Sequence, residues 1–405
     1  MAQVRPFRGI RPQDALAGEI IAPPYDVLSE AEARAIVAQK PRSFLRVTRS
    51  EVDLPAGSDA HGPVAYAQAR ANLDAFLADG TLIQDDAPCF YLYVQQWQGR
   101  TQAGLMALCD TQEYDRGQIK KHELTRPVKE QDRVDHISAL DAQSGLVFLT
   151  LRDNNTQVRS ALTTAATRAP VWSVTTEDAV THTLIVIDDA DTISEIQDAF
   201  SAVDALYIAD GHHRSAAASR VAAAREGTGS SRWFLAGIFP DSQLKILAYN
   251  RVVDDLNGHS PEAFLDAIQA NFHITPDVAP QPTERGRWTM YLGGMWYGLQ
   301  AKDGVVPHDD PVGRLDVAVL QDRILGPLLG IDNPRTNERI AFVGGIRGHQ
   351  ALSGAVDAGA AVAFHLYPTG IDQLLDVADA DRLMPPKSTW FEPKLRGGVL
   401  IHRLN

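Results

Sequence analysis

Hydrophobic and polar positions follow several distinct patterns along the chain, and each pattern predicts a different element. Apolar side chains recur on one helical face over residues 65–79, and Gly80 marks the expected end of that helix. Another helix is expected from about Ser29, a good N-cap that is followed by Glu30 and Glu32. Residues 50–63 combine acids with Gly, Pro and Ser, which is typical of a surface loop.

The central part of the chain alternates between apolar runs and helical patterns. Residues 89–97 and 105–114 flank Gly99-Arg100 and predict a β-hairpin. Short strands are expected at 184–187, 205–209 and 233–239, with helices near 191–202 and 214–225. A further strand at 244–253 is expected to pair back through the turn at 241–243.

A second region is expected from about Pro261. It contains predicted strands at 288–292, 295–301, 340–343 and 361–367 and predicted helices across 315–329 and 371–380. Hairpins mixed with strand–helix units indicate an α+β, or mixed α/β, fold. We expect one domain over residues 1–260 and another over 261–405, whose last loop (384–396) returns to the site of the first.

Composition narrows the functional classes. The 405 residues are 44% hydrophobic and 22% charged, which is ordinary for a soluble globular protein. The formal net charge of −13 argues against a nucleic-acid-binding face but permits a local basic pocket for a nucleotide. Cys89 and Cys109 are interpreted as buried free thiols in a reducing compartment. No apolar run reaches the about 18 residues of a membrane span, and no signal peptide is evident, so we expect a cytoplasmic protein without a membrane partner.

One strand–helix junction concentrates more functional groups than any other segment. Asp210-Gly211-His212-His213-Arg214 lies between an apolar run and an Ala-rich helix that is expected to begin at about Arg214. Gly211 permits a backbone conformation closed to other residues and a close approach of a ligand. The free N–H groups of the helix N-terminus favour an anion such as phosphate, and Arg214 could add a bidentate contact. The alternative is a structural turn with merely polar histidines.

Residues 120–133 form a basic segment in an acidic chain, with five Lys or Arg against three acids. They are interpreted as a loop whose Lys129 and Arg133 suit a polyphosphate. His122 and Glu123 offer a general acid–base pair. A solvated, charged loop is the alternative.

Three further segments are candidates for the same site. Prolines stiffen the loop that carries Tyr25 and Asp26, although Asp26 could simply cap the next helix. Residues 249–251 end a predicted strand with polar side chains. The Pro- and Lys-containing loop at 385–395 is a plausible lid over a phosphate, or a packed C-terminal loop; its polar candidates are Lys387, Ser388, Thr389 and Lys394.

Several well-known signatures are missing. The chain has no Gly-x-Gly-x-x-Gly after a strand, no His-Glu-x-x-His, no Cys-x-x-Cys and no Gly-x-Ser-x-Gly. Adjacent histidines usually diverge, so a preformed zinc site at residues 212–213 is not expected.

The order of these motifs resembles the DUF1015 family, a family of domains of unknown function. The segments that carry the resemblance are Ala-Pro-Pro-Tyr-Asp-Val (22–27), His-Glu-x-Thr (122–125) with Lys129 and Asp132-Arg133, Asp-Gly-His-His-Arg (210–214), Tyr-Asn-Arg-Val-Val (249–253) and Met-Pro-Pro-Lys-Ser-Thr-Trp-Phe-x-Pro-Lys-Leu (384–395). The turn at 210–214 is similar to the nucleotide-binding signature of the ParB/sulfiredoxin superfamily, which implies a ParB/sulfiredoxin-like nucleotide-binding core. That superfamily includes CTP-dependent DNA-segregation proteins, ATP-dependent sulfinic acid reductases and free-serine kinases. The turn lacks the reductase cysteine, and the acidic charge disfavours DNA segregation.

By this resemblance the chain is expected to be a nucleotide-dependent kinase for a small hydroxyl metabolite, with free L-serine as the favoured acceptor. ATP or ADP would be the phosphate donor, with Mg²⁺ held by Asp210 or Glu123. Asp26 or Glu123 would be the base, with His122 as a further catalytic candidate. The expected phosphate contacts are Asp210, Gly211, His212, His213, Arg214, Lys129, Arg133, Lys387, Ser388, Thr389 and Lys394, and the expected substrate contacts are Tyr25, Thr125, Tyr249 and Arg251. A non-catalytic ATP- or CTP-binding switch and a metal-dependent phosphohydrolase are the alternatives.

Overall fold

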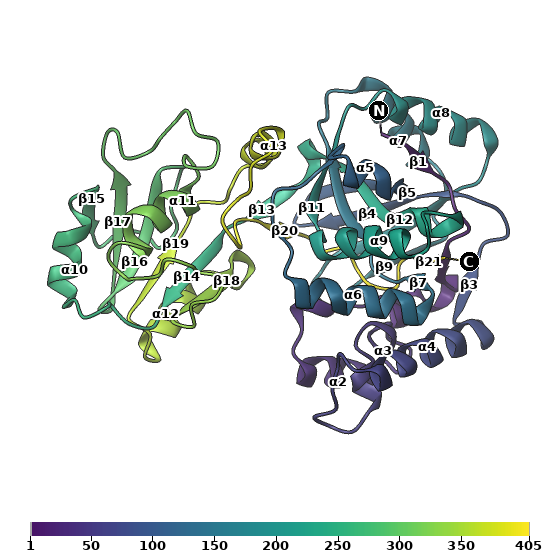
Figure 1. Ribbon diagram of the computed structural model, residues 1–405, viewed down its shortest axis with the longest axis horizontal. Coiled ribbons are helices and arrows are strands. Elements are labelled where there is room, and N and C mark those ends of the chain that lie inside the picture. The colour runs from purple at the N-terminus through teal and green to yellow at the C-terminus, as the bar shows by residue number, and fades with distance from the viewer. Residues whose placement is uncertain (1, 405) are drawn as a thin grey trace. The chain divides into compact units, whose positions relative to one another are not determined.

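The computed structural model describes residues 2–404 and divides the chain into two compact units. Unit 1 runs up to Leu244 and resumes at Pro393, whereas unit 2 spans Lys245–Glu392. Both ends of the chain therefore belong to unit 1 (Figure 1). The two units are described separately below.

The observed boundary differs from the predicted one after residue 260. Residues 244–253 do not fold back on 233–239 as expected. They form β13 (Lys245–Leu247) and β14 (Tyr249–Val253), which pair with strands of unit 2. The Asn257-Gly258 turn, a few residues before the predicted boundary, lies inside unit 2. The loop at 384–396 is likewise divided, since only its part from Pro393 on belongs to unit 1.

Unit 1 is built around a nine-stranded mixed sheet. Its strand order is β6 (Ile119–Lys120), β11 (Leu206–Asp210), β8 (Val147–Leu151), β12 (Trp233–Pro240), β5 (Arg100–Asp110), β4 (Phe90–Trp97), β10 (Thr181–Ile187) and β9 (Trp172–Thr175), with β1 (Val4–Arg5) beside β5. The pairs β6–β11 and β8–β12 are parallel, and the other pairs are antiparallel. The predicted hairpin is confirmed as β4 and β5.

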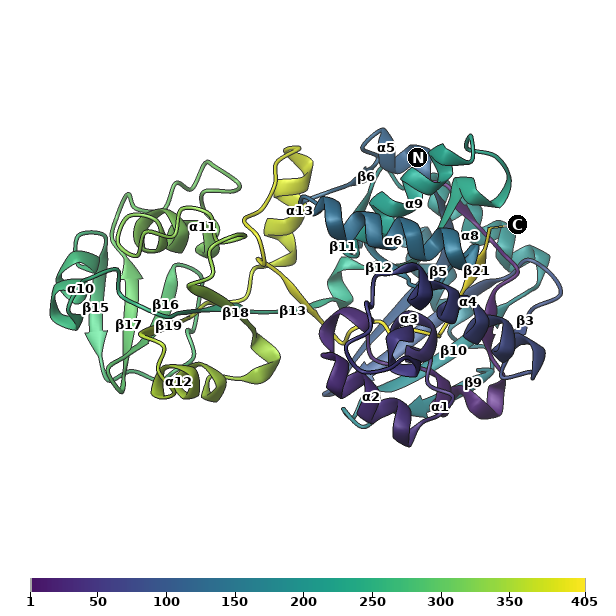
Figure 2. The same cartoon turned by 60° about the horizontal axis from the view of Figure 1, so that its bottom comes forward.

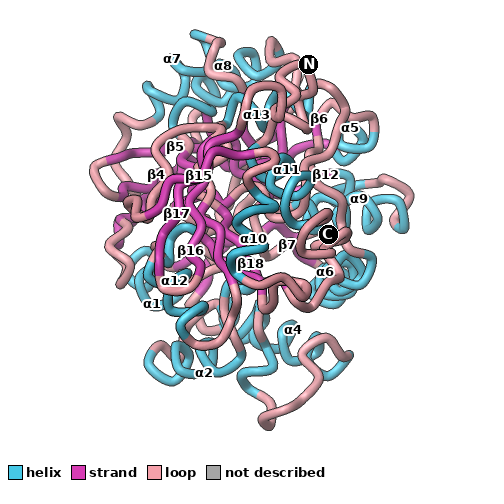
Figure 3. The backbone as a smooth tube through the Cα atoms, turned by 90° about the vertical axis from the view of Figure 1, so that its left-hand side faces the viewer, coloured by secondary structure: helices cyan, strands magenta, loops and turns pink. Residues whose placement is uncertain are grey.

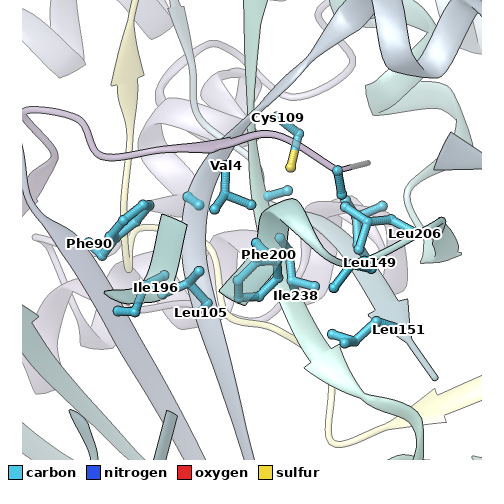
Figure 4. Close-up of a cluster of buried hydrophobic side chains, with 14 of the residues drawn as sticks. Val4, Phe90, Leu105, Cys109, Leu149, Leu151, Ile196, Phe200, Leu206 and Ile238 are labelled. Carbon is cyan, nitrogen blue, oxygen red and sulfur yellow. The ribbon is translucent and has the colours of Figure 1, made fainter. Parts of the chain in front are cut away.

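One face of this sheet holds the main hydrophobic core. Alternate residues of β4, β5, β8 and β12 point into it, as the two-residue period of a strand requires. The helices α7 (Thr156–Ala165) and α8 (Ala190–Ser201) add apolar side chains, among them Ile196 and Phe200 (Figure 4). Cys109 lies in this core, and both Cys109 and Cys89 are buried free thiols, as predicted.

The opposite face of the sheet receives the last residues of the chain. Gln95 Nε2 donates to the carbonyl oxygen of Lys394 at 3.0 Å. Arg396 Nε donates to Nε2 of the fully buried His182 at 3.3 Å. We call residues 393–404 the C-terminal strap. Its β21 (His402–Arg403) pairs with β7 (Ala142–Gln143), so the strap is part of the unit 1 fold.

A layer of helices completes unit 1 around a second core. It contains α1 (Ala17–Ile20), α2 (Glu30–Gln39), α3 (Leu45–Thr48) and α4 (Pro63–Ala78), with the short pair β2 (Ile10–Pro12) and β3 (Leu82–Gln84). Figure 3 shows α2 and α4 in a region of helices and loops only. Ser29 caps α2 as predicted, in a reciprocal capping box with Glu32.

The charged segment 120–133 is not the expected loop. After α5 (Thr111–Asp115) and β6, most of it enters α6 (Pro127–Leu140), with Pro127 in the first turn. Ile137 and Leu140 are buried, and Figure 2 shows α6 beside α9 (His212–Ala224). The strand β8 and the helix α7 had no counterpart among the predicted elements.

Unit 2 contains a six-stranded antiparallel sheet. Its order is β15 (Phe272–Pro276), β17 (Met295–Ala301), β16 (Arg287–Leu292), β19 (Val362–His365), β14 and β18 (Ile340–Gly344). β13 pairs separately with β20 (Trp390–Glu392). The helices are α10 (Pro261–Ile268), α11 (Asp316–Leu320), α12 (Gln350–Asp357) and α13 (Ile371–Asp379). The strands predicted from residue 288 on are confirmed, and with them the mixed α/β class. Within residues 2–404, no helix combines the length and the apolar character that crossing a membrane requires.

Gly104 provides a test of sheet packing in unit 1. A Cβ atom at this position would lie 2.5 Å from the Phe239 ring, so Gly104→Ala should destabilise the protein by about 1–3 kcal/mol through overpacking. At Gly397 an added Cβ would meet Phe44 at an ordinary 3.6 Å, so Gly397→Ala should change stability by less than about 0.5 kcal/mol. Urea unfolding of both variants measures the difference, and equal stabilities would contradict this packing.

His182 provides a test of the strap by pH. Burial, and then the charge of Arg396, lower the pKa of His182 to about 3, whereas an unfolded histidine titrates near about 6.5. Above pH about 6.5 His182 is neutral in both the folded and the unfolded state, so it costs no stability. As the pH falls, only the unfolded histidine takes up a proton, and the free energy of unfolding decreases by about 2 kcal/mol at pH 5. In urea unfolding at pH 7 and pH 5, His182→Gln should lose less stability between the two pH values than the wild type does. The same pH dependence in both proteins would contradict the buried neutral histidine.

Candidate functional site

The strand–helix turn at 210–214 forms as the sequence predicted, with one difference. Gly211 adopts a left-handed conformation (φ 100°), and α9 begins directly after it at His212 rather than at about Arg214. Gly211, the N-cap residue of α9, has no side chain that could accept a hydrogen bond from the first N–H groups of the helix. A Cβ atom at position 211 would also lie 3.1 Å from Arg214 Nε, so both conformation and space require glycine here.

Asp210 ends β11 between two cations. Lys394 Nζ of the C-terminal strap donates to Asp210 Oδ2 at 2.9 Å, and Arg214 Nη2 lies 3.8 Å from Asp210 Oδ1. Burial alone would raise the pKa of Asp210, but the charges of Lys394 and Arg214 hold it well below its usual range. Asp210 is therefore an ionised carboxylate whose charge is shared between two neighbours.

Arg214 points inward from the first turn of α9. Its Nη1 donates to the carbonyl oxygen of Leu146, which directly precedes β8. A Cβ atom at Gly145 would lie 3.2 Å from Arg214 Cδ, so this glycine lets the arginine pass closely. The side chain is thus fixed at the end of β11.

The two histidines of the turn anchor the neighbouring loop. The backbone N–H of Arg126 donates to His213 Nε2 at 2.9 Å, and that of His122 approaches His212 Nε2 at 3.5 Å. A backbone N–H can only donate, so each of these nitrogens accepts and each ring is neutral. Burial lowers the pKa of His122 to about 4 and that of His212 well below its usual range. The Nε2 atoms of both histidines thus contact the segment 122–126, and phosphate contacts of His212 and His213 stay a prediction.

A small buried cavity lies behind the turn. It has a volume of about 30 Å³, and its lining includes Tyr25, Arg133, Ser144 and Arg214. The Arg133 guanidinium stacks 4.2 Å from the Tyr25 ring centre and is held by Asp132 at 2.6 Å. Two arginines from different helices, α6 and α9, therefore line one small cavity.

Asp26 and Glu123 lie on two segments beside the turn. Asp26 is exposed in the 3₁₀ turn Tyr25–Val27, and Arg49 Nη1 holds this turn through the Tyr25 carbonyl oxygen at 3.0 Å. Burial would lower the pKa of Arg214, but the charges of Asp210, Tyr25 and Asp26 raise it, which places Asp26 within electrostatic reach of Arg214. Glu123 is half-buried in the loop that the two histidines anchor.

Two predicted residues of the basic segment lie away from the cavity. Lys129 is exposed on the first turn of α6 and lines an outer groove of about 590 Å³ together with His61. Thr125 Oγ1 donates to Glu130 at 2.7 Å, which ties the loop to α6. Lys129 and Arg133 lie one turn apart on the same side of α6. Lys129 is exposed because it belongs to the first turn, whereas Arg133, one turn further along, is buried.

The remaining predicted residues belong to unit 2, so their part in this site stays a prediction. They do lie together within that unit. Arg251 is buried, and its Nη2 donates to the Pro386 carbonyl oxygen at 3.2 Å. Lys387 Nζ lies 5.5 Å from the centre of the Tyr249 ring. Ser388 Oγ donates to the Pro385 carbonyl oxygen at 2.6 Å, and Thr389 follows it before β20.

Several residues of the site escaped the sequence analysis. Arg49 and the Ser144-Gly145-Leu146 segment carry no recognisable motif. Asp132 was noted only beside Arg133, yet it accepts hydrogen bonds from Arg133 and from the Tyr66 hydroxyl at 2.8 Å. Its Oδ1 also lies 2.6 Å from His61 Nδ1. Only the charge pattern of residues 129–135 could have indicated this network.

The carboxylates at the turn do not fit a resident metal. Within residues 2–404, no group of three or more His, Cys, Asp or Glu side chains is arranged to hold an ion. Asp210 is already engaged by Lys394 and Arg214, which compete with a cation for its oxygens. We therefore assign no step to Mg²⁺.

Comparison with solved structures and with family profiles gives matches to this chain, whereas comparison with curated proteins gives none. Three solved structures are similar at 10% identity: a free serine kinase in complex with AMP (TM-score 0.36, covering 71% of this chain and 86% of that one), C-terminally truncated SbnI from Staphylococcus aureus (0.41, 73% and 85%) and a conserved hypothetical protein from Pyrococcus furiosus (0.36, 73% and 95%). Similarities this distant carry no information on the activity of this chain.

A family profile gives the sequence-level result. The profile described as "Protein of unknown function (DUF1015)" matches residues 4–318. The match includes the turn at 210–214 and the segment 22–27, and it ends before residues 384–395. Because it spans well over half of the 405 residues, the chain belongs to the DUF1015 family.

Proposed function

We propose that this protein is a kinase that transfers a phosphoryl group from ATP or ADP to the hydroxyl of a small metabolite, with free L-serine as the first acceptor to test. One observation carries the proposal: Arg214 in the first turn of α9 and Arg133 of α6 line one small cavity. Phosphoryl transfer depends mainly on positioning and on charge stabilisation, which such a site supplies.

The electrostatics at the cavity favour an anion. Arg214 and Arg133 are like charges. Burial would lower the pKa of each, but neighbouring Asp and Tyr side chains raise it, so both guanidinium groups are charged. Asp132 shares its oxygens among Arg133, Tyr66 and His61, and Asp210 divides its charge between Arg214 and Lys394. A phosphate at the helix N-terminus would add negative charge and accept N–H groups of α9. A volume of about 30 Å³ holds roughly one water, so the nucleotide itself would lie outside the cavity with its terminal phosphate at the mouth.

The reacting groups then have definite roles. The acceptor oxygen forms a bond to the terminal phosphorus while the bond between that phosphorus and the bridging oxygen of the nucleotide breaks. The hydroxyl proton passes to a carboxylate, and we assign this role to Asp26, which is exposed and within electrostatic reach of Arg214. Glu123 is the second candidate. Arg214 and the α9 N–H groups stabilise the charge that develops on the transferred group.

A non-catalytic nucleotide switch is the second candidate function. The observation in its favour is the bond between Lys394 and Asp210, because it connects the C-terminal strap to the same turn. A bound phosphate that replaced Asp210 as the partner of Lys394 would change the position of the strap without any phosphoryl transfer. No observation favours the metal-dependent phosphohydrolase.

Arg214→Ala tests the phosphate assignment. Loss of a charge-assisted contact should weaken ATP or ADP binding by about 1.5–3 kcal/mol, measured by calorimetric titration. Arg220→Ala is the matched control, because Arg220 lies on the same helix but pairs with Glu130 at the surface. Unchanged nucleotide affinity in Arg214→Ala would show that the phosphates bind elsewhere.

Asp26→Asn tests the chemistry. With ATP or ADP and L-serine, the wild type should form phosphoserine, and Asp26→Asn should lower kcat about 10²–10⁴-fold with little change in nucleotide affinity. Glu123→Gln should remain close to the wild type. The reverse pattern would assign the base to Glu123. Nucleotide binding without any phosphorylated product from several hydroxy amino acids would contradict the kinase and favour the switch.

A further inference from the structure

A second cleft of unit 1 collects positive charge in an otherwise acidic protein. Its volume is about 620 Å³, and its lining includes Arg5, Arg8, Arg232 and Arg403 around Trp233. None of its described lining residues is Asp or Glu, although the whole chain carries a net charge of −13. Its lining shares no residue with the cavity behind the turn. We call it the arginine cleft.

The cleft is assembled from distant parts of the chain. Arg5 lies in β1, Arg232 directly precedes β12, and Arg403 lies in β21 of the C-terminal strap. Phe7 and His402 bring the two end segments together, with ring centres 5.8 Å apart (Figure 1 shows β1 and β21 in unit 1). The fold itself therefore gathers these arginines.

Among residues 2–404, only one of the four guanidinium groups has a carboxylate partner. Arg232 is bound to the buried Asp110 at 2.5 Å, which fixes its position. Arg8 donates to a backbone carbonyl oxygen, that of Asp85, at 3.1 Å. Arg5 and Arg403 have no acidic partner among residues 2–404. A cleft with this surplus of positive charge is complementary to an anion.

Trp233 stabilises two of these arginines but does not neutralise their charge. The Arg5 and Arg232 guanidinium groups lie 5.4 Å and 5.5 Å from the centre of its ring, within the range of cation–π attraction. A cation–π contact uses the face of the guanidinium group, so the N–H groups in its plane can still donate hydrogen bonds. The Trp233 ring holds both guanidinium groups in place. Planar guanidinium donors in fixed positions suit the paired oxygens of a phosphate group.

We propose that the arginine cleft is a second anion-binding site, separate from the turn at 210–214, for a small ligand that carries phosphate groups. A volume of about 620 Å³ falls within the usual range of small-molecule sites, about 300–1,000 Å³. The negative charge of the whole chain disfavours a long polyanion such as nucleic acid, which would extend beyond the cleft. Because the ligand would contact both end segments of unit 1, its binding should also stabilise the fold.

Binding of inorganic pyrophosphate to the full chain tests the proposal. Calorimetric titration of the wild type should reveal a site that Arg403→Ala, and separately Arg5→Ala, weakens about tenfold or more, the effect of losing one charge-assisted contact. Arg100→Ala is the matched control, because Arg100 is exposed in the β4–β5 hairpin outside the cleft, and its affinity should stay within about twofold of the wild type. Circular dichroism confirms that each variant is folded.

Two further variants separate this site from the turn. Trp233→Phe should remove the change in tryptophan fluorescence that accompanies pyrophosphate binding. Arg214→Ala should leave pyrophosphate binding at the arginine cleft intact, whatever it does to nucleotide binding. The proposal is overturned if the wild type binds no pyrophosphate at millimolar concentration, if Arg403→Ala and Arg5→Ala bind it like the wild type, or if Arg214→Ala alone abolishes all binding. Tighter binding of a single-stranded DNA oligonucleotide at the same arginines would overturn it in favour of nucleic acid.

Discussion

The contact on which unit 1 depends most is the ionised carboxylate of Asp210 between Lys394 and Arg214. It joins two segments that are far apart in the sequence: the turn between β11 and α9, and the C-terminal strap. Removal of one partner from a largely buried ion pair leaves an uncompensated charge, which costs far more than the pair contributes in net stability. The strap and the turn are therefore coupled electrostatically, although residues 211–393 separate them in the chain.

The same arrangement makes the turn suitable for binding an anion. Asp210 cannot neutralise both of its cationic neighbours, and Arg133 adds a further positive charge at the cavity behind the turn. The neutral His212 and His213 accept N–H groups from the segment 122–126 and so fix the loop beside α9. Positive charge, the N-terminus of α9 and fixed neighbouring segments are thus present before any ligand arrives, which is the preorganisation that the proposed phosphoryl transfer requires.

Local patterns predicted local features well. The Asp-Gly-His-His-Arg turn, the β4–β5 hairpin and the capping box of α2 each depend on a few adjacent residues, and the structure contains all three. Long-range pairing was not predictable in the same way. The apolar run at 244–253 fits a hairpin with β12 equally well, but its partners β18, β19 and β20 lie about a hundred residues further along the chain.

The candidate site shows the same contrast between local features, which the sequence predicted, and long-range contacts, which it did not. Lys129 and Arg133 lie one turn apart on α6, and only Arg133 is buried. The many charges of this segment concealed the helix in the sequence. The roles of the two histidines depend on backbone N–H groups of another segment, which no side-chain motif reports. Residues 249–251 and 385–389 do meet in space, within unit 2.

The most direct test of the central claim is a crystal structure of the protein with bound ADP or a non-hydrolysable ATP analogue. The account predicts a phosphate group within hydrogen-bond distance of the N–H groups at the start of α9, with the Arg214 guanidinium in contact with it. A nucleotide whose phosphates lie away from this turn, with the Lys394–Asp210–Arg214 contacts unchanged, would contradict it.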